Sequence, residues 1–135
     1  MINLDVCGVG DQIVFGPRKN LTKGLLGDML TASNLLQKHK ARIVDYIPPG
    51  DEMSFEREGI PNISIAILPN SEIDVVIKLA EYMEKRQRPQ PGEFTIMPMI
   101  METMHNGPRD YTDIVEEGSM KKVLNFLLDA IYSYN

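Results

Sequence analysis

Residues 59–69 have the sequence GIPNISIAILP, and this stretch decides the fold. Isoleucines at positions 63, 65 and 67 share one face, which predicts a strand over Asn62–Leu68 that ends at Pro69. The following Ser71-Glu72-Ile73-Asp74 has the spacing of a capping box, with aspartate in the glutamate's place. A helix is therefore expected over about 71–86. Its predicted buried residues are Ile73, Val76, Ile77, Ala80 and Met83.

Further strands are predicted on both sides of this unit. Alternation over Ile2–Cys7 predicts a short strand, and turn residues after it allow a hairpin with a second strand at Gln12–Phe15. Ala41–Ile47 is a third strand pattern, stopped by Pro48-Pro49-Gly50. The apolar run Phe94–Met101 contains a proline, so at most an edge strand is expected there.

Helical patterns lie between these strands. One helix is expected over roughly 22–38, although Gly24 and Gly27 weaken it, and a short helix or turn over Asp51–Glu58. The clearest helix is expected over 116–134. Its predicted apolar stripe consists of Met120, Val123, Leu124, Leu127, Leu128 and Ile131.

The alternation of strands and helices predicts the fold class. We expect one α/β domain over residues 1–135, with a β-sheet of mixed direction that helices flank. The sequence shows no internal repeat, no low-complexity tract and no domain boundary.

Composition excludes several classes of protein. The chain has 135 residues, of which 43% are hydrophobic and 24% charged, as expected for a globular chain. A net charge of −5 disfavours nucleic acid as a partner, and the single cysteine excludes an internal disulfide framework. No apolar run reaches the roughly 18 residues of a membrane span, and the first ten residues lack a signal-peptide pattern. We therefore expect a cytoplasmic protein that has no membrane partner.

Three residues stand out as candidates for chemistry. His105 follows an apolar run and opens a loop in which Asp110 could orient its ring, although a surface histidine is the simpler interpretation. Asp5 lies mid-strand between apolar neighbours, where a carboxylate is costly unless it is paired or binds metal. The alternative is that its face of the strand is wet. Asp51 follows a Pro-Pro-Gly turn, where it could also simply cap the next helix.

Other patterns favour structural roles. His39 is expected to be solvated or to interact with a helix C-terminus, and Cys7 to be a small buried residue. Gly8-Val9-Gly10 lacks the third glycine and the helix of a dinucleotide site, so we reject one. The methionines of residues 97–104 lack matching Cys or His residues and are expected to pack in the core.

Three stretches, in order, resemble the C-terminal half of the co-catalytic zinc aminopeptidases of the bacterial leucyl aminopeptidase type, a family that includes the glutaminyl cyclases. Ile2-Asn3-Leu4-Asp5-Val6 resembles the strand whose aspartate binds one zinc. Residues 51–61, with Asp51, Phe55 and Gly59-Ile60-Pro61, resemble the family's Asp-His-x-x-Phe…Gly-Ile-Pro segment. Met104-His105 with Asp110 resembles the segment whose histidine binds the second zinc. The similarity extends over essentially the whole chain, including the last helix.

The resemblance implies roles for these residues. Asp5 and His105 would be metal ligands for two different zinc ions, and Asp51 would be a carboxylate at the reacting centre that does not bind metal. The substrate of the complete enzyme would be a peptide, cleaved at its N-terminal peptide bond. A homo-oligomer is left open.

The sequence also departs from the family. Glu52 stands where the family has histidine, and the interval from His105 to Asp110 is one residue longer. The family's first half has no counterpart in these 135 residues. That half carries the His-x-Asp motif, whose aspartate bridges both metals, and a Glu-Glu pair with the general base. Weak or absent zinc binding is therefore expected for this chain, since a catalytic zinc needs about three protein ligands.

Two hypotheses follow. In the first, the chain is the C-terminal portion of a zinc metallo-aminopeptidase and is inactive as an isolated chain. In the second, it is a non-catalytic α/β binding or assembly module derived from such an enzyme. The substrate, the preferred N-terminal residue and the true start of the protein stay open.

Overall fold

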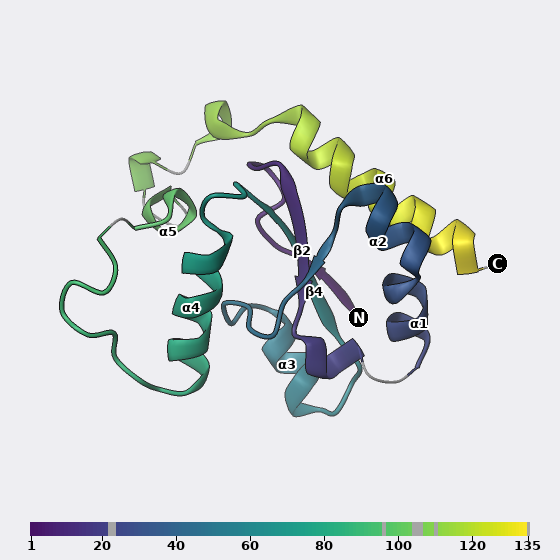
Figure 1. Ribbon diagram of the computed structural model, residues 1–135, viewed down its shortest axis with the longest axis horizontal. Coiled ribbons are helices and arrows are strands. Elements are labelled where there is room, and N and C mark those ends of the chain that lie inside the picture. Colours follow the sequence, from purple (N-terminus) through teal and green to yellow (C-terminus); the bar gives the residue numbers. More distant parts are fainter. Residues whose placement is uncertain (22–23, 96, 104–106, 110, 135) are drawn as a thin grey trace.

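The GIPNISIAILP stretch forms β4 (Ile63–Leu68), an interior strand of a four-stranded sheet. The computed structural model describes residues 1–21, 24–95, 97–103, 107–109 and 111–134. The sheet order is β1-β4-β2-β3, with β1 (Ile2–Leu4), β2 (Gln12–Gly16) and β3 (Arg42–Ile43). β4 runs parallel to β1 and antiparallel to β2, while β3 runs parallel to β2. The predicted α/β class with a mixed sheet is confirmed (Figure 1).

The expected hairpin between the first two strands is wrong, because β4 lies between them. The chain crosses the end of β4 at Gly10, whose φ is +133°. A Cβ on Gly10 would lie 2.3 Å from the backbone carbon of Leu68, so only glycine fits this crossing. The hydrogen bond from Asp11 N–H to the Leu68 carbonyl, 3.2 Å long, then starts the pairing of β2 with β4.

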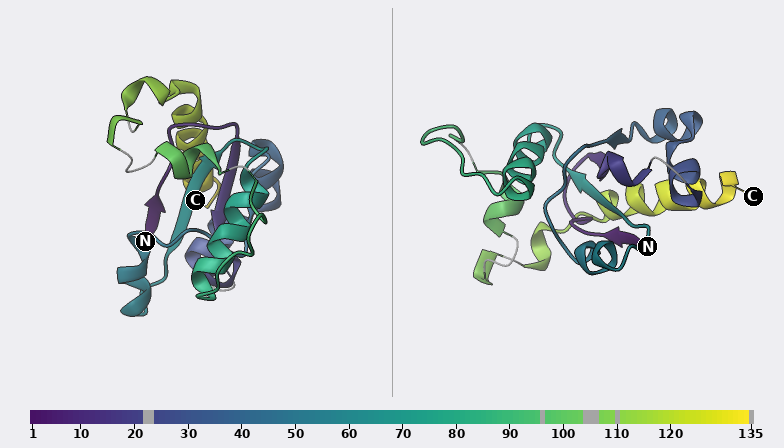
Figure 2. Two further views of the ribbon diagram at one scale, coloured as in Figure 1. Left: turned by 90° about the vertical axis from the view of Figure 1, so that its left-hand side faces the viewer. Right: turned by 90° about the horizontal axis from the view of Figure 1, so that it is seen from below.

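Helices cover both faces of the sheet (Figures 1 and 2). One face, with the three isoleucines of β4 and Phe15, packs against α1 (Leu25–Thr31), α2 (Ser33–His39) and α6 (Glu117–Tyr134). The other face packs against α4 (Ile73–Glu84) and α5 (Met99–Thr103). The short α3 (Glu52–Arg57), predicted from the sequence, is present.

Three expected elements differ from the structure. The helix expected over 22–38 is divided at Ala32, whose ψ of 126° is not helical, and Thr22 and Lys23 lie outside the described residues. The strand expected over Ala41–Ile47 is reduced to β3. No strand forms among the described residues of 94–101, where at most an edge strand was expected, because α5 begins directly after Pro98, whose carbonyl accepts from Met101 N–H at 2.9 Å.

The buried stripe of α6 is also not the one expected. Val123 is buried as predicted and Leu127 packs partly against the core, but the other fully buried positions are Ser119, Phe126 and Ala130. The Phe126 ring lies 5.6 Å from that of Phe15, between centroids. The helix is rotated relative to the expectation. Its exposed aliphatic residues and methionine are Met120, Leu124, Leu128 and Ile131.

Phe126→Ala is expected to lower the free energy of unfolding by about 3–5 kcal/mol, because it leaves a cavity between α6 and β2. Urea denaturation followed by circular dichroism measures the change. Met83→Ala, at a position on α4 that is 44% exposed, serves as the control and is expected to cost less than about 1 kcal/mol. Equal losses in the two variants would contradict the observed orientation of α6.

Candidate functional site

Asp5 lies directly after β1, on the strand at the edge of the sheet. Its backbone N–H donates to the Ile65 carbonyl of β4 at 3.1 Å, so pairing with β4 sets the position of the residue. Its carboxylate is exposed. The expectation of a wet face is therefore correct for this side chain, which is available to a ligand.

The backbone next to Asp5 is strained. Val6 has a φ of +55°, in the left-handed region that a β-branched residue very rarely adopts. Such a conformation costs of the order of 1–3 kcal/mol, and strained residues of this kind cluster at functional sites. The regular pairing of β1 with β4 ends at Asp5. The next hydrogen bond between the two segments, from Ile67 N–H to the Val6 carbonyl at 3.1 Å, uses the carbonyl of the strained residue itself.

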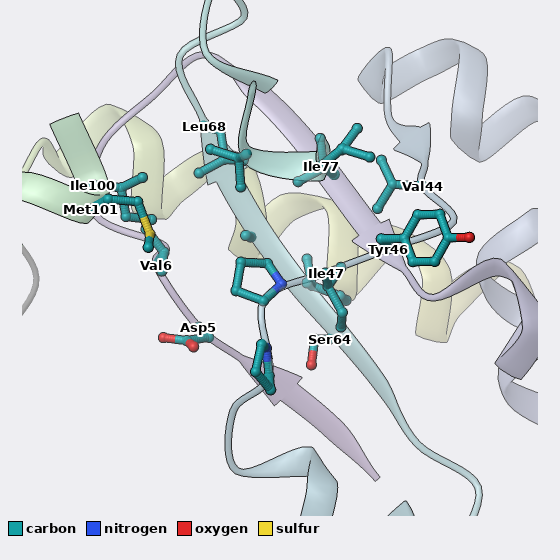
Figure 3. A pocket seen from close by; sticks show the side chains of 16 residues that line it. Asp5, Val6, Val44, Tyr46, Ile47, Ser64, Leu68, Ile77, Ile100 and Met101 are labelled. Atoms are coloured by element: carbon teal, nitrogen blue, oxygen red, sulfur yellow. The ribbon is translucent and has the colours of Figure 1, made fainter. Parts of the chain in front are cut away.

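Two pockets meet at Asp5 and Val6. We call the first the sheet pocket, a cavity of about 70 Å³ between the sheet, α4, α5 and residues 44–49. In Figure 3, Asp5 lies at one end of this pocket, and the side chains around the remainder are almost all apolar. The second, the loop pocket, has a volume of about 250 Å³ and includes Gly8, Thr103 and Ile114. A carboxylate between two apolar hollows can orient a ligand that carries both a polar group and an apolar one.

Glu52 is the residue that the sequence interpretation missed. Its side chain is only 4% exposed, although it is a carboxylate. It accepts three hydrogen bonds: from Gly50 N–H at 2.8 Å, from Asn3 Nδ2 at 3.1 Å and from Ser64 Oγ at 3.2 Å. These bonds satisfy the buried charge. They also attach the Pro-Pro-Gly segment to both β1 and β4.

This attachment brings residues 48–52 against Asp5. A Cβ built on Gly50 would lie 2.9 Å from Glu52 Oε2 and 3.4 Å from Asp5 Oδ2. A larger residue than glycine at position 50 would therefore press against the Glu52 carboxylate. Pro48 and Pro49 then form part of the wall of the sheet pocket.

Asp51 is exposed at the start of α3 and its side chain makes no capping hydrogen bond there. The capping role that was the alternative for Asp51 is therefore not observed, and in this short helix the inward position belongs to Glu52. A catalytic role for Asp51 stays a prediction. His105 and Asp110 lie outside the described residues, so their positions relative to Asp5 also stay predictions.

His39 is less solvated than expected. Its side chain is 12% exposed, and its Nε2 lies 2.5 Å from Asp129 Oδ2 on α6. The Phe126 ring packs against it edge-on, with 5.5 Å between ring centroids. A hydrogen bond from Lys38, with a smaller contribution from His39, lowers the pKa of Asp129 below its usual value. These contacts join α2 to α6, so His39 has a structural role.

The described residues do not by themselves form a metal site. No group of three or more His, Cys, Asp or Glu side chains gathers as metal ligands would in the part of the chain that the structure describes. Asp5 offers one carboxylate, and Glu52 is committed to three donors. A catalytic zinc needs about three protein ligands, so this set is incomplete for zinc.

Comparison of the chain with protein-family models, with curated proteins and with solved structures found no match. No helix within the described residues has the length and apolar composition that crossing a bilayer requires.

Glu52→Ala is expected to lower the free energy of unfolding by about 2–4 kcal/mol, because it removes the buried acceptor that Gly50, Asn3 and Ser64 share. Thermal and urea unfolding measure the loss. The matched control is Asp51→Ala at the neighbouring exposed position, with an expected change below about 0.5 kcal/mol. A larger loss for Asp51→Ala than for Glu52→Ala would reverse this assignment.

The Cys7 thiol is expected to be alkylated slowly by iodoacetamide in the folded protein. Burial, followed by the nearby charge of Asp5, raises the pKa of Cys7 to about 11. The reactive thiolate is therefore scarce at pH 8, and the rate should keep rising as the pH approaches 11. Mass spectrometry of the folded and urea-unfolded chain compares the two rates. In Asp5→Asn the pKa should fall part of the way and the alkylation rate should rise; a plateau in the wild-type rate near pH 9 would contradict the shift.

Proposed function

We propose that this chain is the C-terminal portion of a zinc-dependent aminopeptidase-like metallopeptidase, which hydrolyses N-terminal peptide bonds when the rest of its site is supplied. Asp5 and His105 are the proposed metal ligands, one for each of two zinc ions. Asp51 is the proposed carboxylate at the reacting centre.

One observation carries the proposal: two of the stretches that resemble the family lie together around Asp5, although they are far apart in the sequence. Glu52, from the second stretch, accepts a hydrogen bond from Asn3 of the first at 3.1 Å. Gly50, next to Asp51, approaches the Asp5 carboxylate closely. Thr103, two residues before His105, lines the loop pocket together with Asp5.

The surroundings of Asp5 support the same proposal. An exposed carboxylate, held by backbone pairing and followed by a strained Val6, is the kind of group that functional sites contain. The sheet pocket beside it is lined mainly by apolar side chains and has room for a small one from a ligand. An N-terminal residue with an apolar side chain fits this combination.

A second function has its own supporting observation. The described residues lack a complete ligand set, whereas α6 exposes several large apolar side chains. These two facts favour a non-catalytic α/β module that derives from such an enzyme and serves in binding or assembly. The two functions differ in what the gene encodes before the Met1 codon.

The reading frame upstream of Met1 separates the two functions. An in-frame segment with His-x-Asp and Glu-Glu motifs supports the peptidase, and a genuine start at Met1 supports the module. If such a segment exists, the extended protein should release N-terminal residues from peptides in the presence of zinc. Asp5→Asn should then reduce kcat/KM by at least about 100-fold, while Asp28→Asn, an exposed carboxylate on α1, should leave it unchanged.

The isolated 135-residue chain is expected to show no aminopeptidase activity, because the general base and the bridging aspartate of the resembled family have no counterpart in it. Folded protein is assayed with added zinc on a panel of amino-acid anilides, and circular dichroism verifies the fold. Turnover above a zinc-only control that disappears in His105→Ala would refute the expectation.

A further inference from the structure

α6 carries two apolar stripes, of which the protein covers one. We call the buried residues Ser119, Val123, Phe126 and Ala130 the inner stripe. The outer stripe consists of Met120, Leu124, Leu128 and Ile131, which are 39–54% exposed. Three of these outer residues directly follow an inner one, which rotates them by about 100° around the helix. A helix with apolar residues over so wide an arc is typical of one that packs on two sides.

The outer stripe faces the β1 edge of the sheet. On the opposite side of α6, Asp129 and Phe126 contact His39, so that side faces α2. α2 leads directly into β3, which lies at the other edge of the sheet from β1. The right-hand view of Figure 2, seen from below, agrees with this, because β1 and α2 lie on opposite sides of α6 there.

Within the part of the chain that the structure describes, the outer backbone edge of β1 is open. The bonds to β4 use the Met1 carbonyl and the Asp5 N–H, so the odd-numbered residues point their backbone groups towards β4. The backbone groups of Ile2 and Leu4 therefore point away from the sheet. Leu4 is also 51% exposed, on the same strand face as Ile2, which packs against the core cluster of the inner stripe. An open strand edge beside exposed apolar side chains is a surface for pairing.

We propose that a second copy of this chain covers this surface, in a dimer with twofold symmetry. An axis perpendicular to the sheet, passing beside Asn3, pairs β1 antiparallel with its copy, so that Ile2 of one chain lies opposite Leu4 of the other. The same rotation keeps both α6 helices on one side of the joined sheet and places their outer stripes against each other. A single twofold rotation thus covers both the open edge of β1 and the outer stripe of α6, as an isologous interface requires. The dimer goes beyond the proposed function and does not depend on it.

The available area fits a second copy. Leu4, Tyr132 and the outer stripe are each 39–72% exposed and together offer on the order of 500 Å². A standard interface takes about 800 Å² from each partner, and homodimer interfaces are about 65% apolar. These residues therefore supply about the apolar area that each chain contributes to a homodimer interface. The ion pair of Glu117 with Lys121, 2.6 Å long, supplies charged groups near one end of the stripe.

Sedimentation velocity over a range of concentrations tests the proposal. At about 100 µM the wild-type chain should sediment as a dimer of twice 15.3 kDa, and it should dissociate on dilution. Leu124→Glu should weaken the dimer at least tenfold, because it places a charge in the middle of the outer stripe. Met83→Glu is the matched control: Met83 is 44% exposed on α4, across the sheet, and its variant should dimerise like the wild type.

Hydrogen exchange tests the strand pairing separately. In the dimer, the amides of Ile2 and Leu4 should be protected from exchange, and Leu124→Glu should remove that protection while the amide of Asp5 stays protected by β4. A wild-type chain that remains monomeric at 100 µM overturns the proposal, even if it binds lipid vesicles or another protein. A dimer that Leu124→Glu leaves intact, in a variant that is folded by circular dichroism, also overturns it.

Discussion

The pairing of β4 on both of its edges is the constraint on which the rest of the structure depends. β4 joins β1 on one side through a parallel ladder and β2 on the other through an antiparallel one. Its side chains alternate between the two helical layers, so each layer packs against the same strand. Among the described residues β1 pairs with β4 only, so this ladder sets the backbone position of Asp5.

Glu52 adds a second constraint at this place. Burial of a carboxylate is unfavourable, and its three hydrogen bonds offset that cost only while Asn3, Ser64 and Gly50 keep their positions. The segment that forms one wall of the sheet pocket is therefore fixed to the two strands that form its floor. The surface beside Asp5 is therefore preformed rather than assembled from independent segments.

The sequence correctly predicted the features that local residue patterns determine. It failed for features that depend on residues far away in the sequence. Alternation in β4 and the capping spacing after it gave the α/β class correctly. The predicted hairpin was wrong because β2 pairs with β4, some fifty residues later in the sequence. The turn residues at Gly8–Gly10 do not indicate that partner. The predicted buried stripe of α6 was wrong because two sides of this helix carry apolar residues. Periodicity alone does not show which side packs against the sheet.

The candidate site was predictable in part. Asp5 was identified by a carboxylate in an apolar strand, and the structure places it at the rim of two pockets. Glu52 gave no such signal, because a glutamate in the first turn of a short helix is also what the helix dipole favours at a surface. Its burial depends on Asn3 and Ser64, which are remote in the sequence.

The position of α6 has a consequence for the order of folding. The Ser119 hydroxyl donates to the Gly10 carbonyl across 109 residues, and the inner stripe closes one face of the sheet. Contacts between such distant parts of a chain form late, because a long loop must close before they stabilise anything. During synthesis on the ribosome, α1 and α2 precede β4, but the part of the isoleucine face that α6 covers stays bare long after β4 has emerged. The nascent chain must avoid aggregation over that interval, and a binding chaperone would find its target on this face.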